Sequence, residues 1–304
     1  MEQNATLTKD KKGAINVSTF SQKIHSYLKH PFSLLVWIIT ILAALLTAAS
    51  FVYLVLYILI KGVPYLRPEL FSWTYDSNNV SMLPSIINTF LLTALSLVIS
   101  VPFGIFAAIY MVEYAKKGNR IVKFIRVTAE TLSGIPSIVY GLFGMIFFVG
   151  VLKMQLSLLS GSLTVAIMVL PTIMRTTEEA LLSVPQSYRE GSFGLGAGKL
   201  RTVFRIVLPS AVPGILSGVI LATGRIVGET AALIYTAGTM AKVPNNLFAS
   251  ARTLSVHMYL LSNEGLHTNE AFATAVVLLV FVMLINMLAN FVARRLSAKN
   301  AEND

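Results

Sequence analysis

The sequence predicts an all-α polytopic membrane protein with six transmembrane helices. Charged residues make up 12% of the 304-residue chain and hydrophobic residues 55%, whereas a soluble domain carries about 25% charged residues. Several apolar runs reach the length of about 20 residues that a helix needs to cross a bilayer. A chain in lipid must form helices or a closed barrel. Because these runs do not alternate between polar and apolar residues, helices are favoured.

Four segments follow one another along the chain. Residues 1–30 are hydrophilic and rich in lysine, which predicts a basic cytoplasmic tail, and residues 31–62 predict an N-terminal transmembrane helix that acts as an uncleaved signal anchor. Residues 82–296 hold five further spans, and residues 297–304 form a second cytoplasmic tail. We place these five spans at roughly 84–112, 132–152, 162–176, 211–234 and 271–292.

The basic residues are unevenly distributed among the loops. The net charge is +10, and most lysines and arginines lie in the two tails, in a predicted loop at 113–126 and in the segment after the fourth span. Loops on the cytoplasmic side carry this excess, so both termini are expected in the cytoplasm and the protein in the bacterial plasma membrane. Since the lipid bilayer accounts for the positive charge, no nucleic-acid partner is expected.

The residue types exclude several kinds of chemistry. The chain has no cysteine, which excludes disulfides and thiolate metal sites, and its four histidines do not form the HExxH pair of a metal site. The glycines at 194, 196 and 198 have neither the spacing nor the βαβ context of a dinucleotide site. Leu200 stands where a P-loop needs Ser or Thr after its lysine. The chain is therefore expected to bind no cofactor and to be no enzyme.

A polar, glycine-rich insert at residues 178–209 separates the fourth and fifth spans. It predicts two short helices, from about 185 to 195 and from about 199 to 207. Gly196 and Gly198 end the first helix, because glycine accepts the left-handed conformation found at helix C-termini. Pro209 ends the second helix, because it lacks the backbone donor. Such an insert lies outside the lipid and is expected to dock on another protein.

The fifth span carries two charged side chains. Arg225 and Glu229 are four residues apart and are expected on one helix face, and ionisable residues at membrane depth face a bundle interior or a pathway. Small residues on the same helix allow other helices to approach closely. They form two ladders, Gly214–Gly218–Ala222 and Gly224–Gly228–Ala232.

Two roles remain open for this pair. Arg225 is suited to bind a tetrahedral oxyanion, and Glu229 can accept a hydrogen bond from protonated phosphate, which sulfate does not offer. Alternatively, the two side chains form an internal salt bridge that fixes helix packing. Arg175 is a further candidate for the substrate pathway, or else an anchor at the cytoplasmic edge of the fourth span.

One motif in the insert resembles a known family. Glu190-Gly191-Ser192, three residues, Gly196, nine residues and Ile206-x-Leu208-Pro209 are similar to the EAA loop of ABC importer permeases. The resemblance implies that this loop forms a coupling helix in a cleft of a cytoplasmic ATPase subunit. The implied contacts are Glu190, Gly191, Ser192, Gly196, Leu208 and Pro209.

Three further segments resemble the A-type (PstA-type) permease subunit of phosphate-specific ABC importers. They are residues 109–115, 134–144 and 224–238, and the resemblance extends over about residues 30–296. One departure is Ala232, where the A-type pattern commonly has proline. The family implies a MetI-like core of five helices, here with one added N-terminal helix, and Arg175, Arg225 and Glu229 as pathway residues.

The same resemblance implies a set of partners. A second, PstC-type permease completes the pathway, a PstB-type ATPase dimer holds ATP and Mg, and an extracytoplasmic PstS-type protein delivers inorganic phosphate. Three alternatives were weighed: an importer of another oxyanion such as sulfate or molybdate, a secondary transporter, and an intramembrane enzyme. A secondary transporter would need internal repeats, and none is evident in the sequence.

Overall fold

A computed structural model describes residues 31–116 and 118–301. The predicted tail at 1–30 and the last three residues of the tail at 297–304 lie outside the described residues. The chain divides into two compact units, residues 1–57 and 58–304, and each is considered by itself. All regular elements in the described residues are helices, which confirms the predicted fold class.

The first unit holds most of α2, which runs from Pro31 to Gly62. Its sequence is apolar on every side, and Lys61 in its last turn is the only charged residue. A helix that is apolar all round belongs in lipid or in the centre of a large protein. This segment is one of the candidate membrane spans.

The second unit holds the remaining helices. Their bounds are α3 Leu83–Ile109, α4 Arg120–Ser133, α5 Ser137–Gly144, α6 Leu158–Ser183, α7 Gln186–Gly194, α8 Lys199–Thr202, α9 Leu208–Gly228, α10 Ala231–Thr236, α11 Leu254–Glu264 and α12 Thr268–Ala301. Wider π-helical turns continue three of them, at Tyr110–Tyr114, Met145–Val151 and Val203–Val207. Short 3-10 turns lie at Val63–Tyr65 and Pro68–Phe71.

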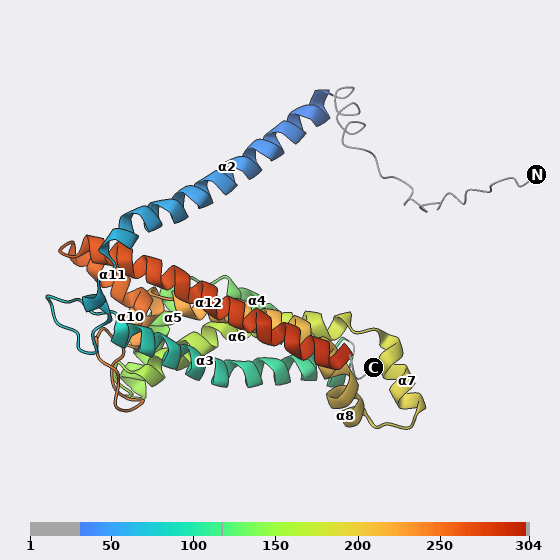
Figure 1. The fold of residues 1–304 in the computed structure, drawn as a ribbon. Coiled ribbons are helices and arrows are strands. Elements are labelled where there is room, and N and C mark those ends of the chain that lie inside the picture. The colour runs from blue at the N-terminus through green and yellow to red at the C-terminus, as the bar shows by residue number, and fades with distance from the viewer. Residues whose placement is uncertain (1–30, 117, 302–304) are drawn as a thin grey trace, which may run out of the picture. The chain divides into compact units, whose positions relative to one another are not determined.

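The long helices α3, α6 and α12 run lengthwise through this unit (Figure 1), and α6 contacts α3 along much of its length and also contacts α9. The buried side chains of Leu92, Val165, Met168 and Ile226 form the centre of the core. The first small-residue ladder explains the close approach of α9 to α6. A Cβ atom added at Gly214 would lie 2.6 Å from the side chain of Ala180, closer than two carbon atoms can pack.

The two glycines of the second ladder make no such close contact. A Cβ atom added at Gly224 or Gly228 would meet no atom within 4 Å in the described chain. The third member, Ala232, lies in α10 and not on the same helix, and it is buried so close to α5 that a Cβ atom added at Gly141 would lie 2.8 Å from its Cα. Close packing of α9 against α6 therefore depends on the first ladder, whereas Gly224 and Gly228 take no part in packing within the described chain.

The broken span begins earlier than the sequence predicts. Residues 120–133 form the amphipathic helix α4, so the prediction of a loop at 113–126 is wrong for Arg120 onward. The Asn119 side chain caps this helix by accepting a hydrogen bond from the Ile121 N–H at 2.8 Å. A turn at 134–136 then bends the chain by 104° into α5. With this bent pair counted as one span, the described residues hold up to six spans, as predicted.

The insert folds into two short helices, as predicted, but Pro209 does not end the second one. The chain stays helical from Lys199 through the π-helical turn at 203–207 into α9. Proline lacks a backbone N–H and disrupts an α-helix, and a wider turn is a common way to absorb such a disruption. The α7–α8 hairpin (residues 186–202) is thus joined directly to the next span.

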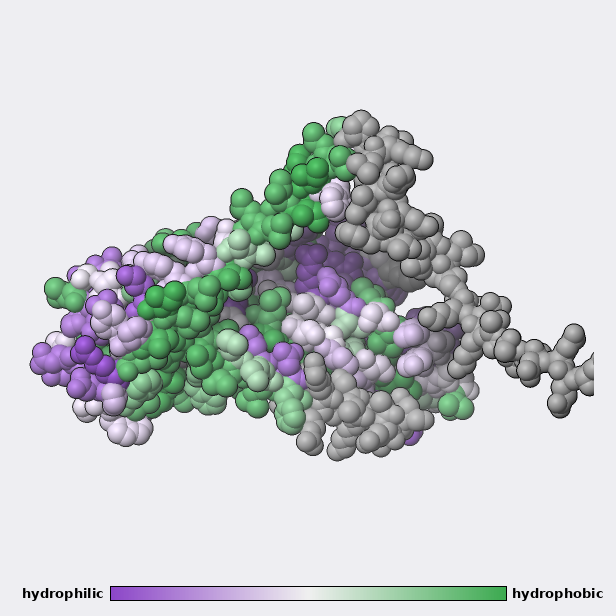
Figure 2. Space-filling model, turned by 45° about the horizontal axis from the view of Figure 1, so that its top comes forward, coloured by the Kyte–Doolittle hydropathy of each residue, from purple (hydrophilic) through white to green (hydrophobic). Residues whose placement is uncertain are grey.

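The unit has two contrasting ends (Figure 1). One end is formed by the α7–α8 hairpin and is called the hairpin end. The loop end consists of residues 63–82, residues 237–253 and α11. Figure 2 shows hydrophilic residues over the loop end and a broad apolar surface on the adjoining helices, as expected where helices leave lipid.

Buried hydrogen bonds hold the loop end together. The Asn88 side-chain amide donates to the backbone oxygens of Lys242 and Arg252 at 3.0 and 3.1 Å. The Leu254 N–H donates to the Thr89 hydroxyl at 2.8 Å. These bonds attach α3 to a segment more than 150 residues away in sequence.

His257 belongs to the same buried network at the loop end. Its side chain is fully buried. Burial and, to a smaller extent, the nearby charge of Arg252 lower the pKa of His257 to about 3, against a smaller opposing effect of the Val80 backbone. The imidazole is therefore neutral at physiological pH.

Candidate functional site

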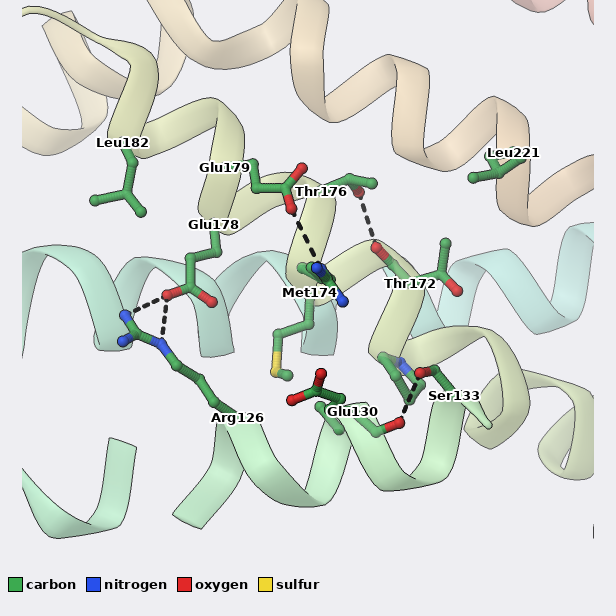
Figure 3. A pocket seen from close by; sticks show the side chains of 13 residues that line it. Arg126, Glu130, Ser133, Thr172, Met174, Thr176, Glu178, Glu179, Leu182 and Leu221 are labelled. Carbon is green, nitrogen blue, oxygen red and sulfur yellow. Dashed lines mark hydrogen bonds and ion pairs between the residues drawn. The ribbon is translucent and has the colours of Figure 1, made fainter. Parts of the chain in front are cut away.

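A cavity of about 520 Å³ lies between α4 and the second half of α6, with Leu221 of α9 at its edge. Figure 3 shows the polar side chains that α4 and α6 direct into it. They are Arg126, Glu130 and Ser133 from α4 and Thr172, Arg175, Thr176, Glu178 and Glu179 from α6. Both helices place residues three or four positions apart on one face, which explains the spacing of this set.

Two ion pairs cross or border the cavity. Arg126 of α4 donates from Nε to Glu178 Oε1 at 2.7 Å, and its terminal nitrogen contacts the same oxygen. Arg175 Nε lies 3.2 Å from Glu179 Oε1, and these two side chains are 67% and 65% exposed. An exposed pair of this kind contributes only about 0–1 kcal/mol, so Arg175 can exchange its partner at little cost.

The cavity has a small excess of acidic groups. Three glutamates and two arginines line it, and Glu130 forms no ion pair with any described residue. An anion is therefore favoured there only when one of the two Arg–Glu pairs opens. The sequence identified Arg175 but missed Arg126, Glu130 and Glu178. The spacing of Arg126, Glu130 and Ser133 on one helical face is the available signal, but the predicted loop at 113–126 and the predicted span at 132–152 divide this face between them.

Arg225 and Glu229 do not share a helix face, so this prediction is wrong. Helix α9 ends at Gly228, and Glu229 has extended backbone angles. Its Oε1 accepts a hydrogen bond from the Ala232 N–H at 3.0 Å, at the start of α10. Its backbone oxygen accepts another from Ser255 at 2.5 Å. A carboxylate is stabilised at a helix N-terminus, which explains why the chain turns there.

Arg225 lies half-buried in the last turn of α9. No described carboxylate forms an ion pair with it, so the structure does not contain the predicted internal salt bridge. Its charge acts on the phenol of Tyr140, whose hydroxyl donates to the Leu132 oxygen at 2.7 Å next to the bend between α4 and α5. Arg225 is therefore a half-buried cation close to the broken span.

The three predicted pathway residues occupy separate places. Arg175 lines the cavity, whereas Arg225 and Glu229 do not. Leu221, one turn before Arg225 on α9, lines the cavity. Among the lining residues it is the one closest in sequence to Arg225 and Glu229.

The predicted coupling residues divide into exposed and supporting positions. Glu190 and Gly191 are exposed on α7, and Gly196 has a left-handed backbone angle of +81° in the turn that follows. Ser192 is buried and its hydroxyl pairs with that of Thr202 at 2.8 Å, so it joins the two helices of the hairpin. Leu208 and Pro209 lie half-buried in the first turn of α9.

The α7–α8 hairpin exposes large apolar side chains. Leu195 at its turn is 91% exposed, and Tyr188, Phe193 and Leu200 are also exposed. Together with the polar backbone of a glycine-rich turn, this surface is typical of a site that another protein covers.

The described residues offer no cluster of three or more acidic or histidine side chains that could hold a metal ion. The cavity offers arginines and hydroxyls, which can donate hydrogen bonds to an anion, beside carboxylates, which repel one.

The sequence is similar to membrane components of known transport systems. The sequence matches the family described as "Binding-protein-dependent transport system inner membrane component" over residues 100–301. It is 34% identical over 282 residues to the probable ABC transporter permease protein YqgI of Bacillus subtilis (strain 168), covering 86% of this chain and 95% of that protein. It is 31% identical over 231 residues to the phosphate transport system permease protein PstA of Haemophilus influenzae, covering 75% of this chain and 81% of that protein.

The fold is also similar to that of a solved transporter. A chain of the MetNI methionine ABC transporter in an inward-facing conformation superposes with a TM-score of 0.56 at 21% identity. The match covers 71% of this chain and 94% of that chain. It confirms the predicted MetI-like core.

Proposed function

Because the chain belongs to the family of inner membrane components of binding-protein-dependent transport systems, we propose that it is the PstA-type permease subunit of an ATP-driven importer of inorganic phosphate. Relatives named as phosphate permeases support the cargo, as in the 31% identity to the protein of Haemophilus influenzae. The chain contributes half of the translocation pathway, and a PstC-type permease contributes the other half. A PstS-type protein delivers phosphate from outside.

The α7–α8 hairpin is the observation that supports ATPase coupling most directly. It carries the exposed Glu190 and Gly191 next to exposed apolar side chains, and its surface is otherwise unexplained. We assign it as the docking site of a PstB-type ATPase dimer, which binds ATP and Mg. We therefore propose that the hairpin lies on the cytoplasmic side of the membrane, and the basic residues of the two terminal segments support the same side for both termini.

Arg175, Arg225 and Glu229 are proposed as residues of the anion pathway. Arg175 offers a guanidinium from an exposed ion pair with Glu179, and Arg225 offers one that no described carboxylate engages. Either can donate two parallel hydrogen bonds to a tetrahedral oxyanion. Glu229 orients the turn between α9 and α10 through the Ala232 N–H.

Uptake in proteoliposomes tests the proposal. The chain is reconstituted with its permease partner, the ATPase and the binding protein, and radiolabelled phosphate is followed with and without ATP. Uptake is expected to require ATP and the ATPase. Phosphate uptake by the chain alone, driven by an ion gradient, would instead identify a secondary transporter.

The cargo is tested in the same vesicles. Excess sulfate or molybdate is expected to leave phosphate uptake unchanged, and strong competition would favour the importer of another oxyanion. Glu229→Gln removes the charge but keeps an oxygen that can accept from Ala232. If this variant keeps both uptake and selectivity, Glu229 serves only the turn.

A further inference from the structure

The side chain of Arg189 connects the α7–α8 hairpin to two other helices. Arg189 of α7 donates from Nε and Nη2 to Glu113 Oε1 at 3.0 and 2.7 Å. It also donates from Nη1 to the Val184 oxygen at 2.8 Å and from Nη2 to the Leu181 oxygen at 2.9 Å. One guanidinium therefore connects α7, the C-terminal end of α6 and the turn that follows α3.

This contact is buried. The side chains of Arg189 and Glu113 are 11% and 8% exposed, although the residues around Arg189 on α7 face outward. A buried charge pair loses the solvation of both ions, and this loss is offset only where geometry and further hydrogen bonds are good. Here the Glu113 carboxylate accepts hydrogen bonds from two nitrogen atoms of Arg189. Two backbone oxygens at the end of α6 accept the other hydrogen bonds of the guanidinium.

Arginine is specifically suited to this position. The planar guanidinium carries five N–H donors in a fixed arrangement, whereas lysine offers a single charged nitrogen on a flexible stem. The free backbone oxygens at the end of α6 also favour a positive charge there. A lysine would keep the charge but could not reach the carboxylate and both oxygens in the same way.

Neighbouring contacts also attach the hairpin to this turn. Lys199 Nζ of α8 lies 5.0 Å from the centre of the Tyr114 ring, and Tyr114 follows Glu113 in the π-helical turn 110–114. The hydroxyl pair of Ser192 and Thr202 joins α7 to α8 at 2.8 Å. Both helices of the hairpin are thus attached to consecutive residues at the end of α3.

We propose that Arg189 and Glu113 form the joint that transmits a displacement of the α7–α8 hairpin to α3 and α6. The inference rests on the proposed function, since it takes the hairpin as the docking site of the ATPase. Helix α6 carries Arg175 and lines the cavity, and α3 packs along α6. The joint therefore lies between the surface that receives the ATPase and the helix that faces the anion. Arg189 is a positioning residue and touches neither ATP nor phosphate.

The test compares Arg189→Lys and Glu113→Gln with the unaltered chain in the reconstituted complex. Phosphate uptake and ATP hydrolysis are measured in the same vesicles, each divided by the amount of assembled complex. Loss of a coupling contact of typical strength changes an equilibrium about 5- to 150-fold, so we expect the phosphate imported per ATP hydrolysed to fall about tenfold. ATPase binding, measured by co-purification, is expected to persist.

Two further variants complete the design. The double reversal Arg189→Glu with Glu113→Arg keeps opposite charges at the joint and is expected to recover part of the coupling that either single reversal loses. Arg120→Lys, at an exposed arginine at the start of α4, is the matched control and is expected to leave the ratio unchanged.

The outcomes separate the two proposals. An unchanged ratio of phosphate to ATP in Arg189→Lys and Glu113→Gln would overturn the joint, even if less complex assembles, because a purely structural role lowers the amount and not the ratio. Absence of ATP-dependent uptake by the unaltered complex would overturn the proposed function itself.

Discussion

The hairpin end and the loop end of the second unit are held together in different ways. At the hairpin end, one buried ion pair between Arg189 and Glu113 concentrates the attachment in a single side chain. At the loop end, neutral hydrogen bonds donated by the Asn88 amide and accepted by the Thr89 hydroxyl spread the attachment over several backbone groups. An element with one concentrated attachment can be displaced as a body, while a distributed network resists displacement.

The largest effect is expected from breaking the concentrated attachment. Arg189→Ala leaves the Glu113 carboxylate buried without its partner, and removal of one member of a buried pair costs about 3–5 kcal/mol. The melting temperature of the purified chain in detergent measures this loss. Arg201→Ala, at an exposed position on α8, is the control. Equal melting temperatures for the two variants would contradict the assignment of Arg189 as the main attachment of the hairpin.

A smaller loss is expected at the loop end. Asn88→Ala removes two hydrogen bonds and leaves the Lys242 and Arg252 oxygens without this donor, which costs about 1–3 kcal/mol for a buried polar group. Thermal melting again reports the change, with exposed Asn263→Ala as the control. Because other bonds remain, this variant should still transport. Loss of transport with full stability would mean that the loop end also takes part in coupling.

Acid should weaken the loop end through His257. The pKa of His257 is about 3 in the folded chain and ordinarily 6.5. Below pH 6.5, His257 therefore binds a proton in the unfolded chain but not in the folded chain. Stability is therefore lost as the pH falls from 6.5 toward 3, by about 2 kcal/mol at pH 5. Melting curves at pH 7.5 and 5 measure this loss. His257→Gln should show a smaller dependence on pH, and an identical slope in both proteins would refute the explanation.

The smallest effects concern two glycines of the hairpin, and they are expected to have opposite signs. Gly196 has a φ of +81°, and a side chain in this left-handed region costs about 1–2 kcal/mol, so Gly196→Ala should lower the melting temperature. Gly191 lies within α7, where an added Cβ meets no atom within 4 Å, so Gly191→Ala should raise stability by about 0.5–1 kcal/mol. Two changes of the same sign would contradict the turn geometry.

The sequence predicted those features that depend on composition and local pattern. Apolar runs located the long spans, and the glycines at 196 and 198 located the turn of the hairpin. It failed where local patterns were ambiguous. Residues 120–133 are too polar to suggest a span, although their charged and apolar positions alternate with helical spacing. Pro209 suggested a helix end, yet a π-helical turn lets the helix continue.

Pairings between distant residues could not be predicted in this way. Glu113 and Arg189 are 76 positions apart, and nothing in the spacing of either motif relates them. The pairing of Arg126 with Glu178 is similar, since it depends on how α4 lies against α6. The four-residue interval between Arg225 and Glu229 suggested a pair on one face, but the helix ends between them because Glu229 binds the first turn of α10. Tertiary geometry decided the first two cases, and a local hydrogen bond accompanies the helix end in the third.

The uninterrupted helical run from Lys199 to Gly228 has a mechanical consequence. With 30 residues and a rise of about 1.5 Å per residue, it is a rod of about 45 Å. A rod of this length that tilts by about 5° moves its far end by about 4 Å, more than the length of a hydrogen bond. Arg225 lies in the last turn of this rod. A tilt that begins at the hairpin would thus be enough to carry the guanidinium into or out of contact with an anion, without any change in the helix itself.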